Sequence, residues 1–333
     1  MKPFKKIHYL SIIGILISII LLSLVLIQLD WQNFIVTLKS VQIQWVIASG
    51  LFMIFGIAIR SLRWNVISGH PRREYRYFWK SMNLGYFANM IYPARAGEVV
   101  RMIAIHRYVG MPQGKAISGV IIDRISDGLI LGVFILLLLA LKDTRFTWGI
   151  AFIFFILIFI ALSLLLLSFI LWGDRLHGKI FRFMKIGPKK IANQLEIWYT
   201  EAFDGVQIMR DKYRFFIILA LSIGAFLADA ICFYLLTLGF GWELPFIVSI
   251  YLAIFIQAGT VIPSAPGYVG IYQIACVLAL RIFGIDDSAA IAYSLVLQVL
   301  GFGIFLFFGG VIVIRDGFSP YMLNKDSTLN SNR

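Results

Sequence analysis

Residues 83–101, NLGYFANMIYPARAGEVVR, begin as an apolar stretch and then break at residues 92–98, YPARAGE. Proline removes a backbone donor and clashes with the preceding helical turn, whereas glycine lets the chain reverse. The segment 81–107 is therefore predicted to form two half-helices joined by a non-helical elbow. Such an elbow is tolerated at membrane depth only where it is buried in protein or lines a polar cavity.

A second segment, residues 245–281, repeats this pattern. It is apolar and breaks at residues 262–268, IPSAPGY, so it too is predicted to be a pair of half-helices around an elbow. The proline and glycine residues assigned to the two elbows are Pro93, Gly97, Pro263, Pro266, Gly267 and Gly270.

The composition places both segments in an integral membrane protein. Of the 333 residues, 60% are hydrophobic and only 14% are charged, whereas about a quarter of the residues in a soluble domain are charged. This excludes a soluble enzyme, a nucleic-acid binder and a disordered chain. The net charge of +13 fits a membrane protein, because Lys and Arg are retained in cytoplasmic loops beside anionic lipid.

Long apolar stretches predict the membrane spans. A helix needs about 20 apolar residues to cross a bilayer. The first stretch has no small-residue cleavage site after it, so it is predicted to be an uncleaved span and not a signal peptide. The stretches of sufficient length are 7–27, 43–62, 116–141, 148–171, 215–240 and 288–314.

The positions of the basic residues predict the topology. We place the N-terminus in the cytoplasm and let both broken segments return to the side from which they enter. Lys and Arg then collect on the cytoplasmic side, as the positive-inside rule requires. The prediction is an all-α polytopic protein of the cytoplasmic membrane, with about six transmembrane helices, two re-entrant broken-helix hairpins and both termini cytoplasmic. The exceptions are Lys39, Lys142, Arg145 and Arg281 outside, and Arg124 within a span.

The order span, span, hairpin, span occurs twice, with three crossings in each half, so the second half must be inverted. Paired interrupted helices in inverted repeats indicate the central site of a transporter; the alternative is a chance coincidence of common Pro and Gly residues. We predict one membrane domain over residues 1–333, with repeats at 1–147 and 148–317 and a polar tail at 318–333. The cytoplasmic amphipathic linker 173–213 suits a helix on the membrane surface or one packed on the protein.

Charged residues near the first elbow form a candidate headgroup site, because charges within a bilayer normally face a cavity or a partner. Glu98 and Arg101 are spaced to pair on one helix. Arg95 lies in the elbow, where a guanidinium beside the free amides of a helix N-terminus would hold a phosphate or carboxylate. The alternative is a structural clamp in which Arg95 or Arg101 ties the elbow to Glu98.

A second acidic and basic group lies in the span 116–141. Asp123 and Asp127 share one helix face, and Arg124 is spaced to pair with Asp127. This leaves the other carboxylate to titrate or to meet Arg95. Farther along, Asp229 has only apolar neighbours in sequence and is either a hydrogen-bonded structural carboxyl or a proton-coupling site.

The second hairpin offers only uncharged polar groups. No catalytic triad, no glycine-rich nucleotide loop and no metal-ligand spacing occur in the sequence, and Cys232 and Cys276 make no disulfide framework. We therefore predict no enzymatic activity, no cofactor and no metal site. The hairpin residues able to bind a polar ligand are Gln257, Thr260, Ser264, Tyr268, Tyr272 and Gln273.

These motifs resemble the lysylphosphatidylglycerol synthase transmembrane-region family, also called the flippase-like domain or UPF0104 family. The resemblance rests on residues 83–101, on Asp123-Arg124-x-x-Asp127 and on residues 263–273, PSAPGYVGIYQ. It covers nearly the whole chain. It implies a membrane region that handles a lipid with a polar headgroup, without the soluble aminoacyl-transferase domain of bifunctional relatives.

The resemblance also implies site residues. The family's Glu-Arg-x-x-Asp pattern has a shorter first acid here, Asp123. Its Pro-Gly-x-x-Gly-x-x-Glu element ends here in Gln273, which removes a charge from the second hairpin. The headgroup-binding residues carried over or added from spacing are Arg95, Glu98, Arg101, Asp123, Arg124 and Asp127.

The leading expectation is a lipid transporter of the flippase type. Its cargo would be an aminoacyl-phosphatidylglycerol, another phospholipid or a polyprenyl-phosphate-linked sugar. Its partners would be membrane lipids, with no nucleic acid. Two alternatives remain open: a membrane scaffold for a separately encoded lipid-modifying enzyme or glycosyltransferase, and an intramembrane enzyme that acts on a lipid-linked substrate.

Overall fold

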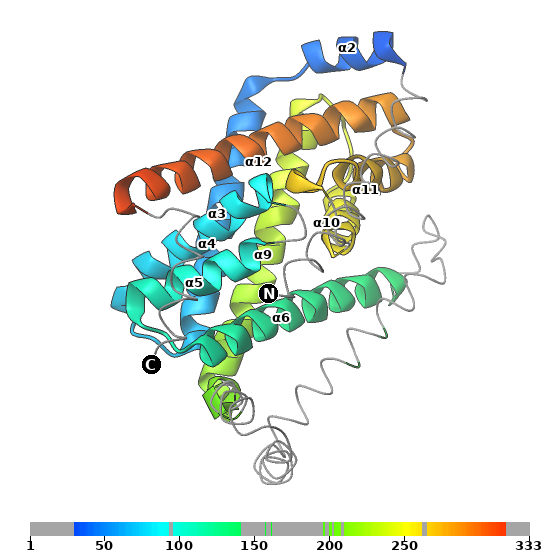
Figure 1. Ribbon diagram of the computed structural model, residues 1–333. Coiled ribbons are helices and arrows are strands. Elements are labelled where there is room, and N and C mark those ends of the chain that lie inside the picture. The colour runs from blue at the N-terminus through cyan, green and yellow to red at the C-terminus, as the bar shows by residue number, and fades with distance from the viewer. Residues whose placement is uncertain are drawn as a thin grey trace.

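The computed structural model describes residues 30–92, 96–140, 157, 161, 196, 200–201, 203–207, 210–261 and 265–317. Within these ranges the chain is helical and has no strand. Figure 1 shows the long helices α3 and α9 side by side, with the other helices crossing around them. The elements before residue 141 are α2 (Trp31–Lys39), α3 (Ile43–Ser68), η1 (Arg72–Glu74), α4 (Tyr75–Ile91), α5 (Gly97–Val109) and α6 (Gln113–Ala140). Those after residue 211 are α9 (Lys212–Gly239), α10 (Ile247–Thr260), η3 (Pro266–Tyr268), α11 (Ile271–Arg281) and α12 (Asp287–Asp316).

Three of the described helices, α3, α9 and α12, are long and apolar enough to cross a membrane. They correspond to three of the predicted spans, although α3 continues past Leu62 to Ser68. Helix α6 matches a fourth predicted span in length, but Asp123, Arg124 and Asp127 interrupt its apolar sequence. The spans predicted at 7–27 and 148–171 lie outside the described residues. The six crossings, the inverted repeat and the re-entry of the hairpins stay predictions.

Helices α3 and α9 pack closely because small residues line their contact. Ser49 donates a hydrogen bond to the carbonyl oxygen of Cys232 at 2.9 Å, and a Cβ at Gly56 would lie 3.6 Å from the Cβ of Ala228. Small side chains let helix backbones approach in a membrane, where no hydrophobic force drives them together. This pair forms the support on which the shorter helices are arranged.

The first broken segment is the helix pair α4 and α5. Its two backbones touch, since a Cβ placed on Gly97 would lie 2.0 Å from the carbonyl oxygen of Gly85. The Asn89 side chain accepts a hydrogen bond from the Gly97 amide at 2.8 Å, which ties the end of α4 to the start of α5. Glycine is required at residue 97 because no side chain fits there. The elbow residues Pro93 and Arg95 lie outside the described residues.

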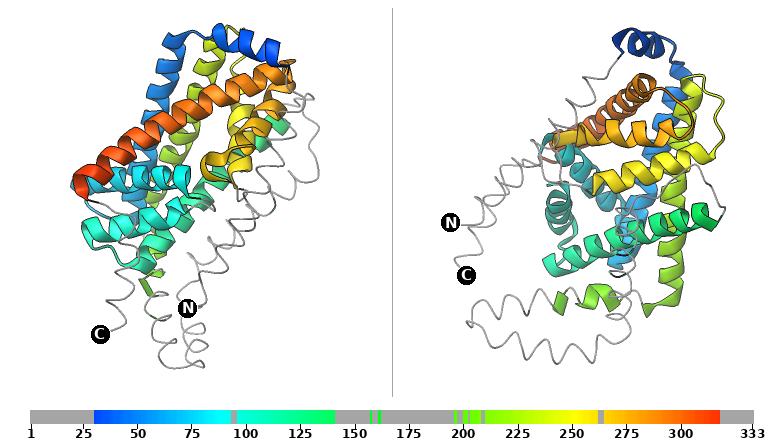
Figure 2. Two further views of the ribbon diagram at one scale, coloured as in Figure 1. Left: turned by 45° about the horizontal axis from the view of Figure 1, so that its top comes forward. Right: turned by 90° about the vertical axis from the view of Figure 1, so that its right-hand side faces the viewer.

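The second broken segment is the pair α10 and α11, with the short helix η3 before α11. Gly267 has φ 70°, a left-handed conformation that favours glycine, and a Cβ there would collide with the ring of Phe302 on α12. Pro266 begins η3 and Gly270 immediately precedes α11. Pro263 and Ser264 are among the residues that are not described. Figure 2 shows the two helix pairs from two further sides, and α4 contacts η3.

The described part of the linker packs beneath α6. The Glu201 carboxylate accepts a hydrogen bond from the Gly114 amide at the start of α6, at 2.8 Å. Val206 is buried in a cluster with Ile67, Ile122 and Ile218. Of the two interpretations of the linker, contact with the rest of the protein is the one that these residues adopt.

Gly97→Ala is expected to destabilise the protein by about 1–3 kcal/mol, because the new methyl group must push α5 away from α4. Gly132→Ala is the matched control, since a Cβ on Gly132 of α6 meets nothing within 4 Å. Thermal unfolding of the purified proteins in detergent measures the difference. Equal melting temperatures for the two variants would contradict the close α4–α5 packing.

Candidate functional site

A cavity of about 430 Å³ lies where the two helix pairs meet. Both pairs line it, the first through Asn89 and Gly97 and the second through Thr260 and Gly267. Helices α3, α6, α9 and α12 complete its wall. Among the residues that the structure describes, the charged ones that line it are Arg60, Glu98, Arg101, Arg124, Asp127 and Asp229.

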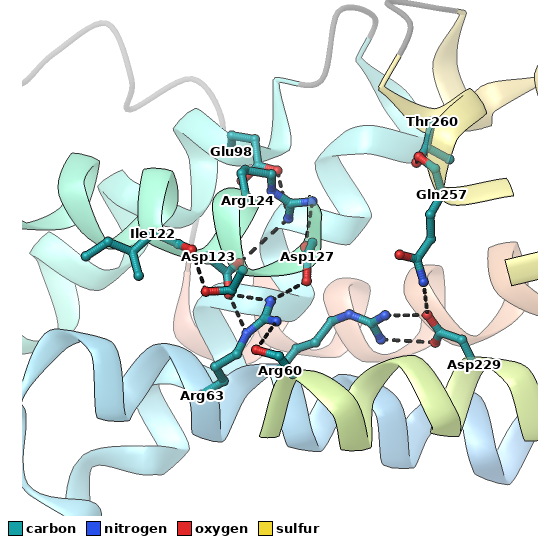
Figure 3. A network of polar contacts seen from close by, with 12 residues as sticks. Arg60, Arg63, Glu98, Ile122, Asp123, Arg124, Asp127, Asp229, Gln257 and Thr260 are labelled. Atoms are coloured by element: carbon teal, nitrogen blue, oxygen red, sulfur yellow. Dashed lines mark hydrogen bonds and ion pairs between the residues drawn. The ribbon is translucent and has the colours of Figure 1, made fainter. Parts of the chain in front are cut away.

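Arg63 of α3 is the centre of the polar network beside this cavity (Figure 3). Its side chain is fully buried, and all three of its nitrogen atoms are bonded. Nε donates to Asp123 at 2.9 Å, Nη2 to Asp127 at 2.7 Å and Nη1 to Ser222 at 3.0 Å. Arg63 therefore joins α3 to α6 and α9 through one guanidinium group.

Arg101 of α5 completes the pairing of Asp123. Its Nη1 lies 2.9 Å from Asp123 Oδ2 and its Nε 2.7 Å from Glu98 Oε2. The guanidinium also lies over the ring of Trp64, 4.9 Å from the ring centroid. Because Arg101 is only 2% exposed, it holds α5 against α6 and α3 and has little surface for a ligand.

Arg124 is the charged residue of this network with the most accessible side chain. It contacts Glu98 Oε1 at 3.1 Å and Asp127 Oδ2 at 3.3 Å, and 42% of its side chain is exposed. Both carboxylates keep another arginine, since Glu98 also contacts Arg101 and Asp127 also contacts Arg63. A ligand can therefore take over Arg124 without leaving either carboxylate unpaired.

A second ion pair lies on another wall of the cavity. Arg60 of α3 donates to Asp229 of α9 through both terminal nitrogens, one of them at 3.1 Å. Gln257 of α10 donates to the same carboxylate at 3.3 Å, as Figure 3 shows. Asp229, alone in its stretch of sequence, thus has a charged partner on the neighbouring long helix.

The candidates from the sequence divide into three groups. Glu98 with Arg101 and Arg124 with Asp127 form the expected contacts, and Asp123, the remaining carboxylate, meets Arg63 and Arg101. Gln257, Thr260, Tyr268 and Tyr272 line the cavity. Arg95 and Ser264 lie outside the described residues, so their roles stay predictions.

Gln273 has a structural contact. Its side-chain oxygen accepts from the Gly270 amide at 2.7 Å, and its nitrogen donates to Gln298 at 2.8 Å. Gln298 in turn donates to the carbonyl oxygen of Gly267 at 2.7 Å. The uncharged amide fits this position because it must donate and accept at once, which an ionised carboxylate cannot do. Gln273 is 1% exposed and holds the second elbow against α12.

Sequence reasoning missed Arg60, Arg63 and Tyr86. Under the positive-inside rule the two arginines count only among the basic residues of the cytoplasmic side. Their spacing of three residues, which places both on one helix face, was the available signal. Tyr86 stacks on Phe305 with ring centroids 4.8 Å apart and lines the cavity; no pattern distinguishes it from other aromatic residues in the segment.

Comparison with known proteins now adds to this geometry. The model of the lysylphosphatidylglycerol synthase transmembrane region matches residues 11–309. The chain belongs to this family. A UPF0104 membrane protein of Methanothermobacter thermautotrophicus is 25% identical over 274 residues, which cover 77% of this chain and 79% of the relative. A UPF0104 membrane protein of Pyrococcus horikoshii is 24% identical over 327 residues, covering 90% and 96%. No solved structure matches the chain.

Arg63→Gln is expected to lower the free energy of unfolding by about 3–5 kcal/mol, as when one partner of a buried ion pair is removed. The control is Arg281→Gln, because Arg281 pairs with Asp287 at a site where 59% of its side chain is exposed. Loss of such an exposed pair costs less than about 1 kcal/mol. Denaturant titrations in detergent measure both variants, and similar losses would show that Arg63 does not organise the fold.

Proposed function

We propose that the protein moves a lipid with a phosphate-containing headgroup across the cytoplasmic membrane, and that the headgroup occupies the cavity between the two helix pairs. The observation that carries the proposal is Arg124. Its side chain is 42% exposed, and the two carboxylates beside it, Glu98 and Asp127, each keep a second arginine. A guanidinium fork matches the geometry of a phosphate.

The cavity wall supports a lipid as the cargo. Beside the charged residues, it has an apolar side formed by residues of α3, α6, α9 and α12, among them Met53, Leu131, Phe233, Leu297 and Phe302. A small hydrophilic solute would gain little binding free energy from contact with this apolar side. A lipid offers both a polar headgroup and an apolar region next to it, and its acyl chains would stay in the bilayer.

The driving force is either the lipid gradient or an ion gradient, since the sequence has no nucleotide-binding motif. Asp229 is the candidate for coupling to protons. Its carboxylate joins α9 to α3 through Arg60 and to α10 through Gln257, so a change at this group would reach three helices. An uncoupled protein would move lipid at the same rate with and without a proton gradient.

Arg124→Gln is expected to slow lipid translocation at least about tenfold, because a charge-assisted hydrogen bond to the phosphate is lost. The measurement uses purified protein in liposomes that contain acyl-chain-labelled phospholipid, with dithionite added to bleach the label in the outer leaflet. The control, Arg281→Gln, removes an arginine far from the cavity lining and should translocate at the wild-type rate.

Wild-type rates in a folded Arg124→Gln protein would remove Arg124 from the headgroup site. No movement by the wild type above empty liposomes, for several headgroups and with a proton gradient imposed, would contradict the transport proposal. Pull-down experiments for a separately encoded enzyme would then be the next step.

A further inference from the structure

The charged side chains that the structure describes around the cavity are equal in number of each sign. Among the described residues that line it, Arg60, Arg101 and Arg124 stand against Glu98, Asp127 and Asp229, and the buried pair Arg63 and Asp123 behind them adds one charge of each sign. A ligand with a net charge would upset this balance among side chains that are mostly buried, which is costly. A ligand that carries one positive and one negative group leaves it neutral.

We propose that the headgroup this cavity accepts is dipolar, with one phosphate and one ammonium group and no net charge. This inference rests on the proposed function and narrows its cargo. The phosphate would lie at Arg124, and the ammonium group would lie at Asp229.

The polar groups at the Arg124 end of the cavity favour this orientation of the headgroup. The Arg124 side chain is 42% exposed, so Arg124 is the arginine at this end that a phosphate oxygen can approach. A phosphate there would share the guanidinium group with Glu98 and Asp127. At this end Glu98 and Asp127 are already held by Arg101 and Arg63.

The opposite end suits a cation. Asp229 accepts a hydrogen bond from Gln257, and Tyr272 lines the same cavity. The rings of Tyr268 and Tyr272 are 6.1 Å apart between centroids and line the same part of the cavity. An ammonium group is attracted both to a carboxylate and to the faces of aromatic rings, and it can join Asp229 beside Arg60.

Tyr86 connects the two ends. It lines the same cavity as Arg60, Arg124, Asp127 and Asp229. Its ring is fixed against Phe305 of α12. A headgroup that bridged Arg124 and Asp229 would therefore pass its phenol group, which can donate to a phosphate oxygen.

The test compares three lipids with the same acyl-chain label: phosphatidylethanolamine, its N-acetylated derivative and phosphatidylglycerol. The last two keep the phosphate but have no ammonium group. In liposomes with wild-type protein, phosphatidylethanolamine should cross at least about tenfold faster than either. The reason is that the other two lipids lack the charge-assisted contact of the ammonium group, whose loss costs about this factor. The double variant Arg60→Gln with Asp229→Asn removes one ion pair as a unit and should bring the ratio close to one.

A matched double variant, Arg281→Gln with Asp287→Asn, removes an exposed ion pair outside the cavity lining and should keep the wild-type ratio. Size-exclusion profiles and thermal unfolding show whether each variant is folded. Equal rates for the three lipids with the wild type, or an unchanged ratio in the folded Arg60→Gln and Asp229→Asn variant, would overturn the dipolar headgroup while leaving lipid transport intact. If no lipid moves, the transport proposal fails and this inference fails with it.

Discussion

The contact between Arg63 and the two aspartates of α6 is the interaction on which the rest of the structure depends. Arg63 and Asp123 are fully buried, and either charge without a partner would cost several kcal/mol. Arg63 therefore fixes how α3, α6 and α9 lie relative to one another. Arg101 adds α5 to the same group through Asp123. Because of these ion pairs, α3, α5, α6 and α9 have little freedom to move relative to one another.

The cavity follows from this arrangement. Once α3, α6 and α9 are fixed, the two shorter helix pairs must fit around them, and they meet where α4 contacts η3. Gly97 lets α5 lie against α4, and Gly267 lets η3 lie against Phe302 of α12, since neither position has room for a side chain. The charges that are not used up in the buried network, above all Arg124 and the Arg60–Asp229 pair, face the space that remains. The residues that hold the helices together and those that face the cavity thus belong to one network.

Much of the fold could be predicted, because the positions of the helices and of their breaks depend on residues that are close together in the sequence. Hydropathy located α3, α9 and α12, and the proline and glycine residues marked the ends of the two helix pairs. Pairs spaced three residues apart, Glu98 with Arg101 and Arg124 with Asp127, were also predictable, because helix geometry alone brings them together. Contacts between distant helices were not. Arg60 with Asp229 and Arg63 with Asp123 are separated by 169 and 60 residues in the chain, and no periodicity encodes such a pairing.

The most direct test of this account is an experimental structure of the protein in a nanodisc that contains phosphatidylethanolamine. The account predicts headgroup density in the cavity, with a phosphate within hydrogen-bonding distance of Arg124 and the Arg63–Asp123–Arg101 network intact behind it. A cavity that is closed by side chains, or that holds only acyl chains while the lipid phosphates stay at the membrane surface, would contradict it.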